Sequence, residues 1–158
     1  RHTIDGTAIA MVGDLKNGRT VRSLAYLLGK YKKVQVSFVS PKALRIGDDI
    51  KEYLDKHNVS YEETETWDSA LPRVNVLYQT RIQKERFKSH AEYKKYKGGY
   101  ILTMKEVDRM KKGAIVMHPL PRVDEIATEV DRSPKAVYFK EAKYGLLIRM
   151  ALLKEILG

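Results

Sequence analysis

Short apolar and alternating segments recur along the chain at intervals typical of β-strands. The segment that contains Val34, Val36 and Phe38 alternates apolar with polar residues, as a strand with one buried face does. Each such segment is four to eight residues long, which is the usual length of a strand. We expect strands at 7–12, 34–38, 59–66, 74–78 and 114–117, the third of them polar and near an edge of the sheet.

Amphipathic stretches with helical periodicity separate these strands. Val21, Leu24, Ala25 and Leu28 follow the i, i+3, i+4, i+7 spacing that places apolar side chains on one face of a helix. Similar patterns follow the second and fourth strands, and the last 22 residues form the longest one. We expect helices over 19–31, 48–58, 106–112 and 136–157, and a short helix or turn over 67–72.

Alternation of strands and helices favours a parallel sheet joined by right-handed crossovers. The expected fold class is therefore α/β: a doubly wound, open parallel sheet of about five strands with helices on both faces (Rossmann-like) and a long C-terminal helix. We expect one domain over residues 1–158. Segment 83–99 is charged and ends in two glycines, which indicates a mobile loop.

Three polar clusters each begin where a predicted strand ends, at residues 13–20, 80–86 and 118–125. Ligands of open α/β sheets bind outside the carboxyl ends of the strands, so we expect these clusters to line one rim. Two arginines from different loops can hold both ends of a dicarboxylate, because a guanidinium group binds a carboxylate through two parallel hydrogen bonds. The arginines of this rim are Arg19, Arg81, Arg86 and Arg122.

Acidic residues stand beside these arginines, so a structural interpretation competes with the functional one. Asp14, Glu85, Asp124 and Glu125 are candidate ion-pair partners within the rim. For Arg122 and Asp124 both interpretations stay open. Asp14 is expected to orient a neighbouring group.

His118 follows a predicted strand and precedes Pro119-Leu120-Pro121. A histidine in this place suggests a general base, but the sequence indicates no carboxylate partner and no nucleophile for it. We therefore expect His118 to be a structural hydrogen-bonding residue. Pro119 and Pro121 lack a backbone N–H and restrict their neighbours, so this stiff segment can direct its carbonyl oxygens at a ligand amine or amide.

Composition and spacing argue against several classes of protein. The chain has no cysteine, which excludes a disulfide scaffold and thiolate metal sites, and its four histidines have no metal-ligand spacing. The turn between Gly13 and Gly18 lacks the G-x-G-x-x-G pattern and a Walker lysine, so neither a nucleotide cofactor nor a metal is expected. No apolar run approaches the roughly 18 residues of a membrane span, so no membrane association is expected.

The 158 residues include 30 Lys and Arg and 20 Asp and Glu, for a formal net charge of +10. Much of the excess lies in 81–112, with 11 basic and 4 acidic side chains. A basic segment favours an anionic partner such as nucleic acid, phosphate or carboxylate, although a solvated lysine-rich surface explains the same pattern. A non-catalytic structural or nucleic-acid-binding module is therefore an alternative, and it predicts salt-dependent binding of nucleic acid.

Taken together, the three clusters resemble the aspartate carbamoyltransferase family. The matching motifs are G-D-L-K-x-G-R-T-V at 13–21, T-R-I-Q-K-E-R-F at 80–87 and M-H-P-L-P-R-V-D-E-I at 117–126, in the family's order and spacing. The residues Y-G-L at 144–146 and R-M-A-L-L at 149–153 also look like the family's C-terminal end. The resemblance implies condensation of carbamoyl phosphate with L-aspartate, giving N-carbamoyl-L-aspartate and phosphate in pyrimidine synthesis.

The resemblance also implies roles for individual residues. Arg19 would bind the α-carboxylate of aspartate, and Arg81 the β-carboxylate, with Gln83 holding Arg81's ligand in place. Backbone carbonyls of Pro119 and Leu120 would contact the carbamoyl group and the attacking amine. Supporting or domain-closure roles fall to Asp14, Lys16, Lys84, Glu85, Arg86, Arg122 and Asp124.

Ornithine carbamoyltransferase is the alternative within the same superfamily. That family typically shows H-C-L-P at the third cluster, where this chain has His118-Pro119-Leu120-Pro121. A rim with two arginines also suits a dicarboxylate better than a cationic side chain. The resemblance therefore favours the aspartate enzyme.

The resemblance covers the aspartate-binding half of the family's catalytic chain. Its N-terminal, carbamoyl-phosphate-binding domain is expected to be absent from residues 1–158, so this domain alone is expected not to catalyse. The expected partners are L-aspartate, that second domain, two further copies in a homotrimer of the complete enzyme, and other pyrimidine-pathway domains or regulatory subunits. The expected location is the cytoplasm, or an organelle if the full chain carries a transit peptide. The helix over 136–157 is apolar all round, so we expect either an exposed apolar patch or a partner that covers it, unless the helix packs more fully on its own domain.

Overall fold

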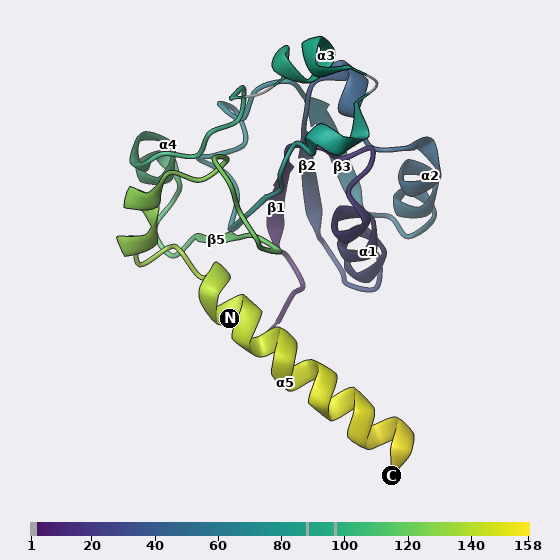
Figure 1. Cartoon of the computed structure of the whole chain (residues 1–158). Helices are drawn as coiled ribbons and strands as arrows, with labels where there is room; N and C mark the ends of the chain where they lie inside the picture. The colour runs from purple at the N-terminus through teal and green to yellow at the C-terminus, as the bar shows by residue number, and fades with distance from the viewer. Residues whose placement is uncertain (1–2, 88, 97) are drawn as a thin grey trace.

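The structure, a computed structural model, describes residues 3–87, 89–96 and 98–158. Its centre is a five-stranded sheet in the order β3-β2-β1-β4-β5, and every neighbouring pair of strands is parallel (Figure 1). The predicted α/β class with a doubly wound parallel sheet is confirmed. The strands are β1 (Ala8–Val12), β2 (Gln35–Val39), β3 (Ser60–Thr64), β4 (Val76–Gln79) and β5 (Ile115–Met117).

The order of the strands reverses next to β1. From β1 the chain moves outward to β2 and β3, and it then returns to the other side of β1 to form β4 and β5. The loops that follow β1 and β4 therefore leave the carboxyl edge next to each other, and the chain then continues toward β2 in one case and toward β5 in the other. This reversal creates the crevice in which open α/β sheets bind their ligands.

Helices cover both faces of the sheet, as predicted. On one face, α1 and α2 bury Val21, Leu28 and Ile50 against Met11 and Phe38 of the strands. On the other face, α4, a 3₁₀ helix and the start of α5 pack against β1, β4 and β5. The helices are α1 (Arg19–Leu28), α2 (Asp48–Lys56), α3 (His90–Lys94), α4 (Met104–Arg109) and α5 (Tyr138–Leu157), with 3₁₀ helices η1 (Lys42–Leu44), η2 (Lys84–Arg86) and η3 (Thr128–Arg132).

Several helix boundaries differ from the predictions by two or three residues. The first helix ends at Leu28 rather than at residue 31, with Gly29 as its C-cap, and Gly29 packs so close to α2 that a Cβ there would be 2.4 Å from the ring of Tyr53. Helix α4 begins two residues earlier than predicted, because Thr103 and Glu106 form a reciprocal capping box.

The loop predicted over 83–99 contains regular structure among its described residues. It includes η2 and the short helix α3. The ring of Phe87 packs against the rings of Tyr93 and Tyr96, with centroids 5.7 and 5.8 Å away. These aromatic contacts give the segment a small apolar centre that its charged composition conceals.

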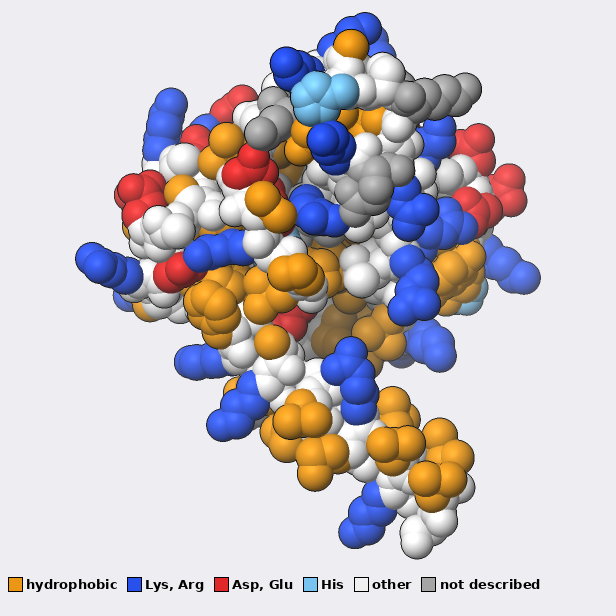
Figure 2. Space-filling view, in the orientation of Figure 1, with side chains coloured by type: hydrophobic (Ala, Val, Ile, Leu, Met, Phe, Trp, Pro, Cys, Tyr) orange, Lys and Arg blue, Asp and Glu red, His pale blue; other side chains and the backbone are white. Residues whose placement is uncertain are grey.

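Helix α5 leaves the body of the molecule and projects from it (Figure 1). Its first residue, Tyr138, is buried, but its apolar side chains from Tyr144 onward are at least 49% exposed. Figure 2 shows groups of apolar side chains along the projecting helix, with basic side chains beside them. Among the described residues, none of the helices is both long enough and apolar enough to cross a membrane.

Candidate functional site

The three predicted polar clusters meet at the carboxyl edge of the sheet and line one cleft of about 260 Å³. Each cluster contributes residues to its wall, so the expectation of a shared rim is met in the geometry. The lining residues are Asp14, Asn17, Gly18, Arg19 and Thr20 from the first cluster, Thr80, Arg81, Gln83 and Arg86 from the second, and His118, Pro119, Leu120 and Pro121 from the third.

The first loop is held close to the second at Gly13. This residue has φ of +115°, and a Cβ on it would lie 2.4 Å from the carbonyl oxygen of Thr80. Thr80 in turn donates from both its backbone N–H and its hydroxyl to the carbonyl of Val12, each at 2.8 Å. Only a glycine allows the two loops to approach so closely, so Gly13 sets their spacing.

Asp14 is buried and orients its neighbours within the first loop. Its Oδ1 accepts hydrogen bonds from the backbone N–H of Asn17 at 3.0 Å and from Asn17 Nδ2 at 3.1 Å, and its Oδ2 accepts from Nδ2 at 3.0 Å. The carboxylate therefore shapes the turn that leads into α1. This is the orienting function expected for Asp14.

Arg19 is the first residue of α1, and its side chain is exposed at the cleft. Within the described ranges of the chain, its guanidinium group forms no ion pair. The helix has no acidic residue in its first turn and no side-chain cap on its N-terminus. The free N–H groups and the positive end of the helix dipole add to the charge of Arg19, so this wall attracts anions.

The second loop, which follows β4, contributes Arg81 and Gln83 to the wall of the cleft. Both residues are partly buried. Gln83 Oε1 accepts a hydrogen bond of 3.2 Å from Nε of Arg86. Three arginines thus line the cleft, and Asp14, the acidic residue among its described lining residues, bonds Asn17 through its carboxylate. The cleft is electropositive and suits a ligand with more than one negative group.

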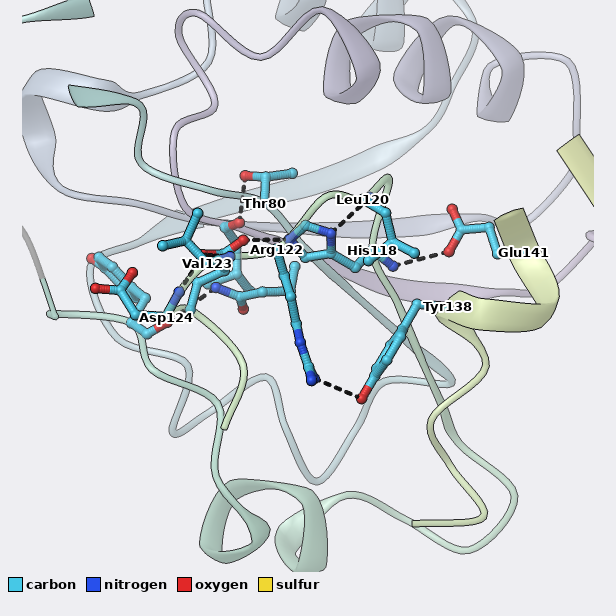
Figure 3. Close-up of polar contacts among 12 residues, drawn as sticks. Thr80, His118, Leu120, Arg122, Val123, Asp124, Tyr138 and Glu141 are labelled. Atoms are coloured by element: carbon cyan, nitrogen blue, oxygen red, sulfur yellow. Dashed lines mark hydrogen bonds and ion pairs between the residues drawn. The ribbon is translucent and has the colours of Figure 1, made fainter. Parts of the chain in front are cut away.

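His118 is buried at the base of the third loop, and its two ring nitrogens have different partners (Figure 3). Nδ1 accepts a hydrogen bond of 2.8 Å from the backbone N–H of Leu120. Nε2 must then carry the proton, and it donates to Oε1 of Glu125 at 2.7 Å. His118 is neutral and structural in this arrangement. The sequence indicated no carboxylate partner for His118, and the fold supplies one by bringing Glu125 back to it.

Glu125 closes this loop onto itself. Burial by itself raises the pKa of Glu125, but the hydrogen bonds from His118 and from backbone N–H groups outweigh burial and lower the pKa below its ordinary value. Its Oε2 accepts from the N–H groups of Val123 at 3.1 Å and Asp124 at 3.2 Å. Leu120, between these contacts, has φ of +47°, a left-handed conformation that such a network can hold.

Several predicted site residues lie apart from the cleft. Arg122 forms a bidentate ion pair with Asp131, its Nη2–Oδ2 distance is 2.6 Å, and it also bonds the hydroxyl of Tyr138. This decides its role in favour of the structural interpretation. Asp124 lines a separate small pocket beside Gln79. Lys16 and Lys84 are exposed and are not among the described lining residues of the cleft, and the side chain of Glu85 lies outside what the structure describes.

Other residues of the site were missed by the sequence reasoning. Asn17 fixes Asp14, and Glu141 of α5 accepts a hydrogen bond of 2.9 Å from the backbone N–H of His118. A three-residue spacing between Asp14 and Asn17, typical of a turn, could have indicated the first contact. Glu141 is 23 residues away from His118, and no local pattern indicates that contact.

These features define a class of protein: an α/β domain with an arginine-lined cleft, suited to an anionic ligand, at the switch point of its sheet. Among the described residues, no group of three or more His, Asp or Glu side chains is placed to hold a metal ion. The family model for the Asp/Orn-binding domain of aspartate/ornithine carbamoyltransferase matches residues 5–156. The chain therefore belongs to the aspartate/ornithine carbamoyltransferase family.

Similar proteins carry the name of the aspartate enzyme. The chain is 52% identical over 155 residues to aspartate carbamoyltransferase 3, chloroplastic, of Pisum sativum, covering 98% of this chain and 40% of that one. The catalytic subunit of aspartate transcarbamoylase from M. jannaschii superposes with a TM-score of 0.89 at 51% identity, covering 97% of this chain and 50% of that one.

A third similar structure was solved with a ligand. Aspartate transcarbamoylase from Trypanosoma cruzi, in complex with N-(phosphonacetyl)-L-aspartic acid, superposes with a TM-score of 0.87 at 40% identity, covering 96% of this chain and 49% of that one. The chain spans about half the length of these relatives or less. The family that the sequence motifs indicated is thus confirmed. Residues 1–158 match about half of the longer catalytic chain of M. jannaschii.

Proposed function

We propose that this domain is the aspartate-binding half of an aspartate carbamoyltransferase. The observation that carries the proposal is the convergence of Arg19 and Arg81, from two different loops, on a cleft that Pro119 and Leu120 of a third loop also line. Two guanidinium groups match the two carboxylates of aspartate, and carbonyl oxygens match its amine. The names of the similar proteins support the same substrate.

In this proposal each wall of the cleft has a distinct task. Arg19, supported by the N-terminus of α1, binds the α-carboxylate, and Arg81 binds the β-carboxylate beside Gln83. The carbonyls of Pro119 and Leu120 accept from the amine of aspartate and so orient its lone pair. In the reaction the amine nitrogen forms a bond to the carbamoyl carbon, the bond from that carbon to the phosphate oxygen breaks, and the amine loses a proton. Held substrates and fixed charges account for much of such a rate enhancement.

The complete reaction needs a second wall that binds carbamoyl phosphate. We place the carbamoyl-phosphate-binding domain against the apolar surface of α5, since that surface is exposed here and the relatives are about twice as long. Arg86 lines the cleft, and Lys16 and Lys84 are exposed on the first and second loops, so all three are available to contact that domain on closure. We propose that Glu85 and Asp124 also support the closure of the two domains.

The larger assembly follows from the same family. We propose a homotrimer of complete catalytic chains, with further pyrimidine-pathway domains or regulatory subunits as additional partners. The proposed location is the cytoplasm, or an organelle as in the chloroplastic relative from Pisum sativum.

Replacement of one clamp arginine tests the substrate. In the complete catalytic chain that carries this domain, Arg81→Ala is expected to lower kcat/KM for aspartate roughly 100-fold, because a charge-assisted contact is lost. Arg22→Ala is the matched control, since Arg22 lies one turn into α1 and pairs with Asp49 at the surface. Formation of N-carbamoyl-aspartate is the measurement. Equal activity of the two variants would contradict the clamp.

The alternatives make different predictions in the same assay. An ornithine enzyme would show turnover with ornithine and none with aspartate. A nucleic-acid-binding module would show salt-dependent binding of oligonucleotides and no carbamoyl transfer.

A further inference from the structure

We propose that Glu141 is a positioning residue that ties helix α5 to the loop of residues 118–122, so that the docking of α5 sets the position of the Pro119 and Leu120 carbonyls in the cleft. The kinetic consequence rests on the function proposed above, whereas the structural linkage does not. Nothing in the family resemblance or in the similar proteins assigns a role to Glu141.

The contact itself is a hydrogen bond across two elements. Glu141 stands in the first turn of α5, and its Oε2 accepts the backbone N–H of His118 at 2.9 Å (Figure 3). His118 is the residue that leaves β5, so this N–H has no further strand to pair with. A buried N–H needs an acceptor, and Glu141 supplies it from α5.

The same turn of α5 holds the other end of the loop. Tyr138, three residues before Glu141, lies on the same face of the helix. Its hydroxyl bonds both Arg122 and Asp131, and the Arg122 guanidinium lies 5.7 Å from the centroid of its ring. The first turn of α5 thus contacts the loop at His118 and at Arg122, on either side of Pro119 and Leu120.

A shift of His118 would also move Leu120, because the two residues are hydrogen-bonded within the loop. The ring of His118 accepts the N–H of Leu120 at 2.8 Å, and the ring is also anchored to Glu125. The Leu120 backbone is therefore held by the residue that Glu141 holds. A change at Glu141 is expected to displace the carbonyls on which the amine of the substrate depends.

The orientation of the rest of α5 affects the hydrogen bond between Glu141 and His118. The helix has 20 residues and is about 30 Å long at 1.5 Å per residue. Beyond its first turns it projects from the body and exposes large apolar side chains such as Leu146, Leu153 and Ile156. Whatever covers these side chains fixes the direction of α5, and through Glu141 it fixes the loop.

The contact requires an acceptor oxygen rather than a negative charge. Burial raises the pKa of Glu141 despite the hydrogen bond from His118, and among the described residues no cation forms an ion pair with its carboxylate. A glutamine offers an acceptor in the same place without the charge. Glu141→Gln should therefore preserve the linkage, and Glu141→Ala should break it.

The experiment uses the complete catalytic chain that carries this domain, with Glu141→Ala, Glu141→Gln and the exposed Glu155→Ala as a control on the far end of α5. Amide hydrogen exchange of residues 118–120 is measured first, because it does not depend on activity. The exchange of the His118 and Leu120 amides is expected to accelerate roughly tenfold in Glu141→Ala, the effect of one lost acceptor. It is expected to stay within twofold of the parent in Glu141→Gln and Glu155→Ala.

Steady-state kinetics follow on the same variants. KM for aspartate is expected to rise roughly tenfold in Glu141→Ala and to return in Glu141→Gln, while kcat falls less. Unchanged exchange in Glu141→Ala, or equal exchange in the alanine and glutamine variants, would overturn the linkage. If the parent chain forms no N-carbamoyl-aspartate, the function proposed above fails, and the exchange result still decides the role of Glu141.

Discussion

Nε2 of His118 donates a 2.7 Å hydrogen bond to Oε1 of Glu125, seven residues further along the chain, and both side chains are buried. This pair turns the segment between them into a closed loop, and Pro119 and Leu120 of that loop line the cleft. It also shows why a histidine beside an arginine-lined cleft is not a general base here, since both of its ring nitrogens are engaged.

Replacement of Glu125 by glutamine is expected to destabilise the fold. The carboxylate accepts from His118 on one oxygen and from the N–H groups of Val123 and Asp124 on the other. An amide must direct its NH₂ group at one of these sets of donors, which leaves a buried donor without an acceptor. We expect a loss of about 1–3 kcal/mol in the free energy of unfolding at pH 7, measured by chemical denaturation.

The pH dependence of this effect has a definite sign. The folded-state pKa of Glu125 is lowered from the ordinary glutamate value of 4.5, so the unfolded chain binds the proton more readily. The stabilisation is present above pH 4.5 and is lost as the pH falls through the folded-state pKa. The difference between the parent and Glu125→Gln should therefore shrink in acid, and the exposed Glu155→Gln should show no comparable difference. A constant gap across this range would contradict the assignment.

Gly13→Ala is expected to separate the first and second loops. The new Cβ would lie 2.4 Å from the carbonyl oxygen of Thr80, and φ at this position is +115°. We expect a loss of about 2–4 kcal/mol in the free energy of unfolding, together with weaker binding of aspartate. Gly113→Ala is the matched control, because Gly113 also has positive φ but has nothing within 4 Å of its added Cβ. It should cost only about 1 kcal/mol. Similar losses for the two variants would show that φ alone matters.

The exposed surface of α5 is expected to make the isolated 158-residue chain self-associate. Leu153 and Ile156 are 58% and 76% exposed and lie on one face of the helix. Apolar patches of this kind associate in water unless a partner covers them. Size-exclusion chromatography with light scattering should show a mass that rises with concentration, and Leu153→Lys with Ile156→Lys should lower it. Val123→Lys changes an exposed apolar residue away from α5, and it should leave the mass unchanged. A monomer at every concentration would contradict this prediction.

The fold was largely predictable because short periodic patterns of apolar residues mark most of its strands and helices. Every predicted strand is present within two residues at each end. Burial on both faces leaves apolar runs in central strands such as β1 and β4, whereas β3 at the edge of the sheet is polar and partly exposed. Helix α3 escaped prediction because its support comes from rings of Phe87, Tyr93 and Tyr96 that meet only in three dimensions. The capping box of Thr103 and Glu106 has a sequence signature, but it shifted the start of α4 by only two residues.

By itself, the sequence determined the class of the fold and the identity of three loops at the carboxyl edge of its sheet. Strand ends are local features, and parallel strands necessarily bring them to one edge. Only the tertiary structure decided which polar residues of those loops serve a ligand and which serve the scaffold. Arg19 and Arg81 face the cleft, whereas Arg122, similar in sequence context, is held by Asp131. The physical reason is that a guanidinium or carboxylate binds whichever partner lies within about 3 Å in space, and such partners come from segments whose separation along the chain carries no pattern.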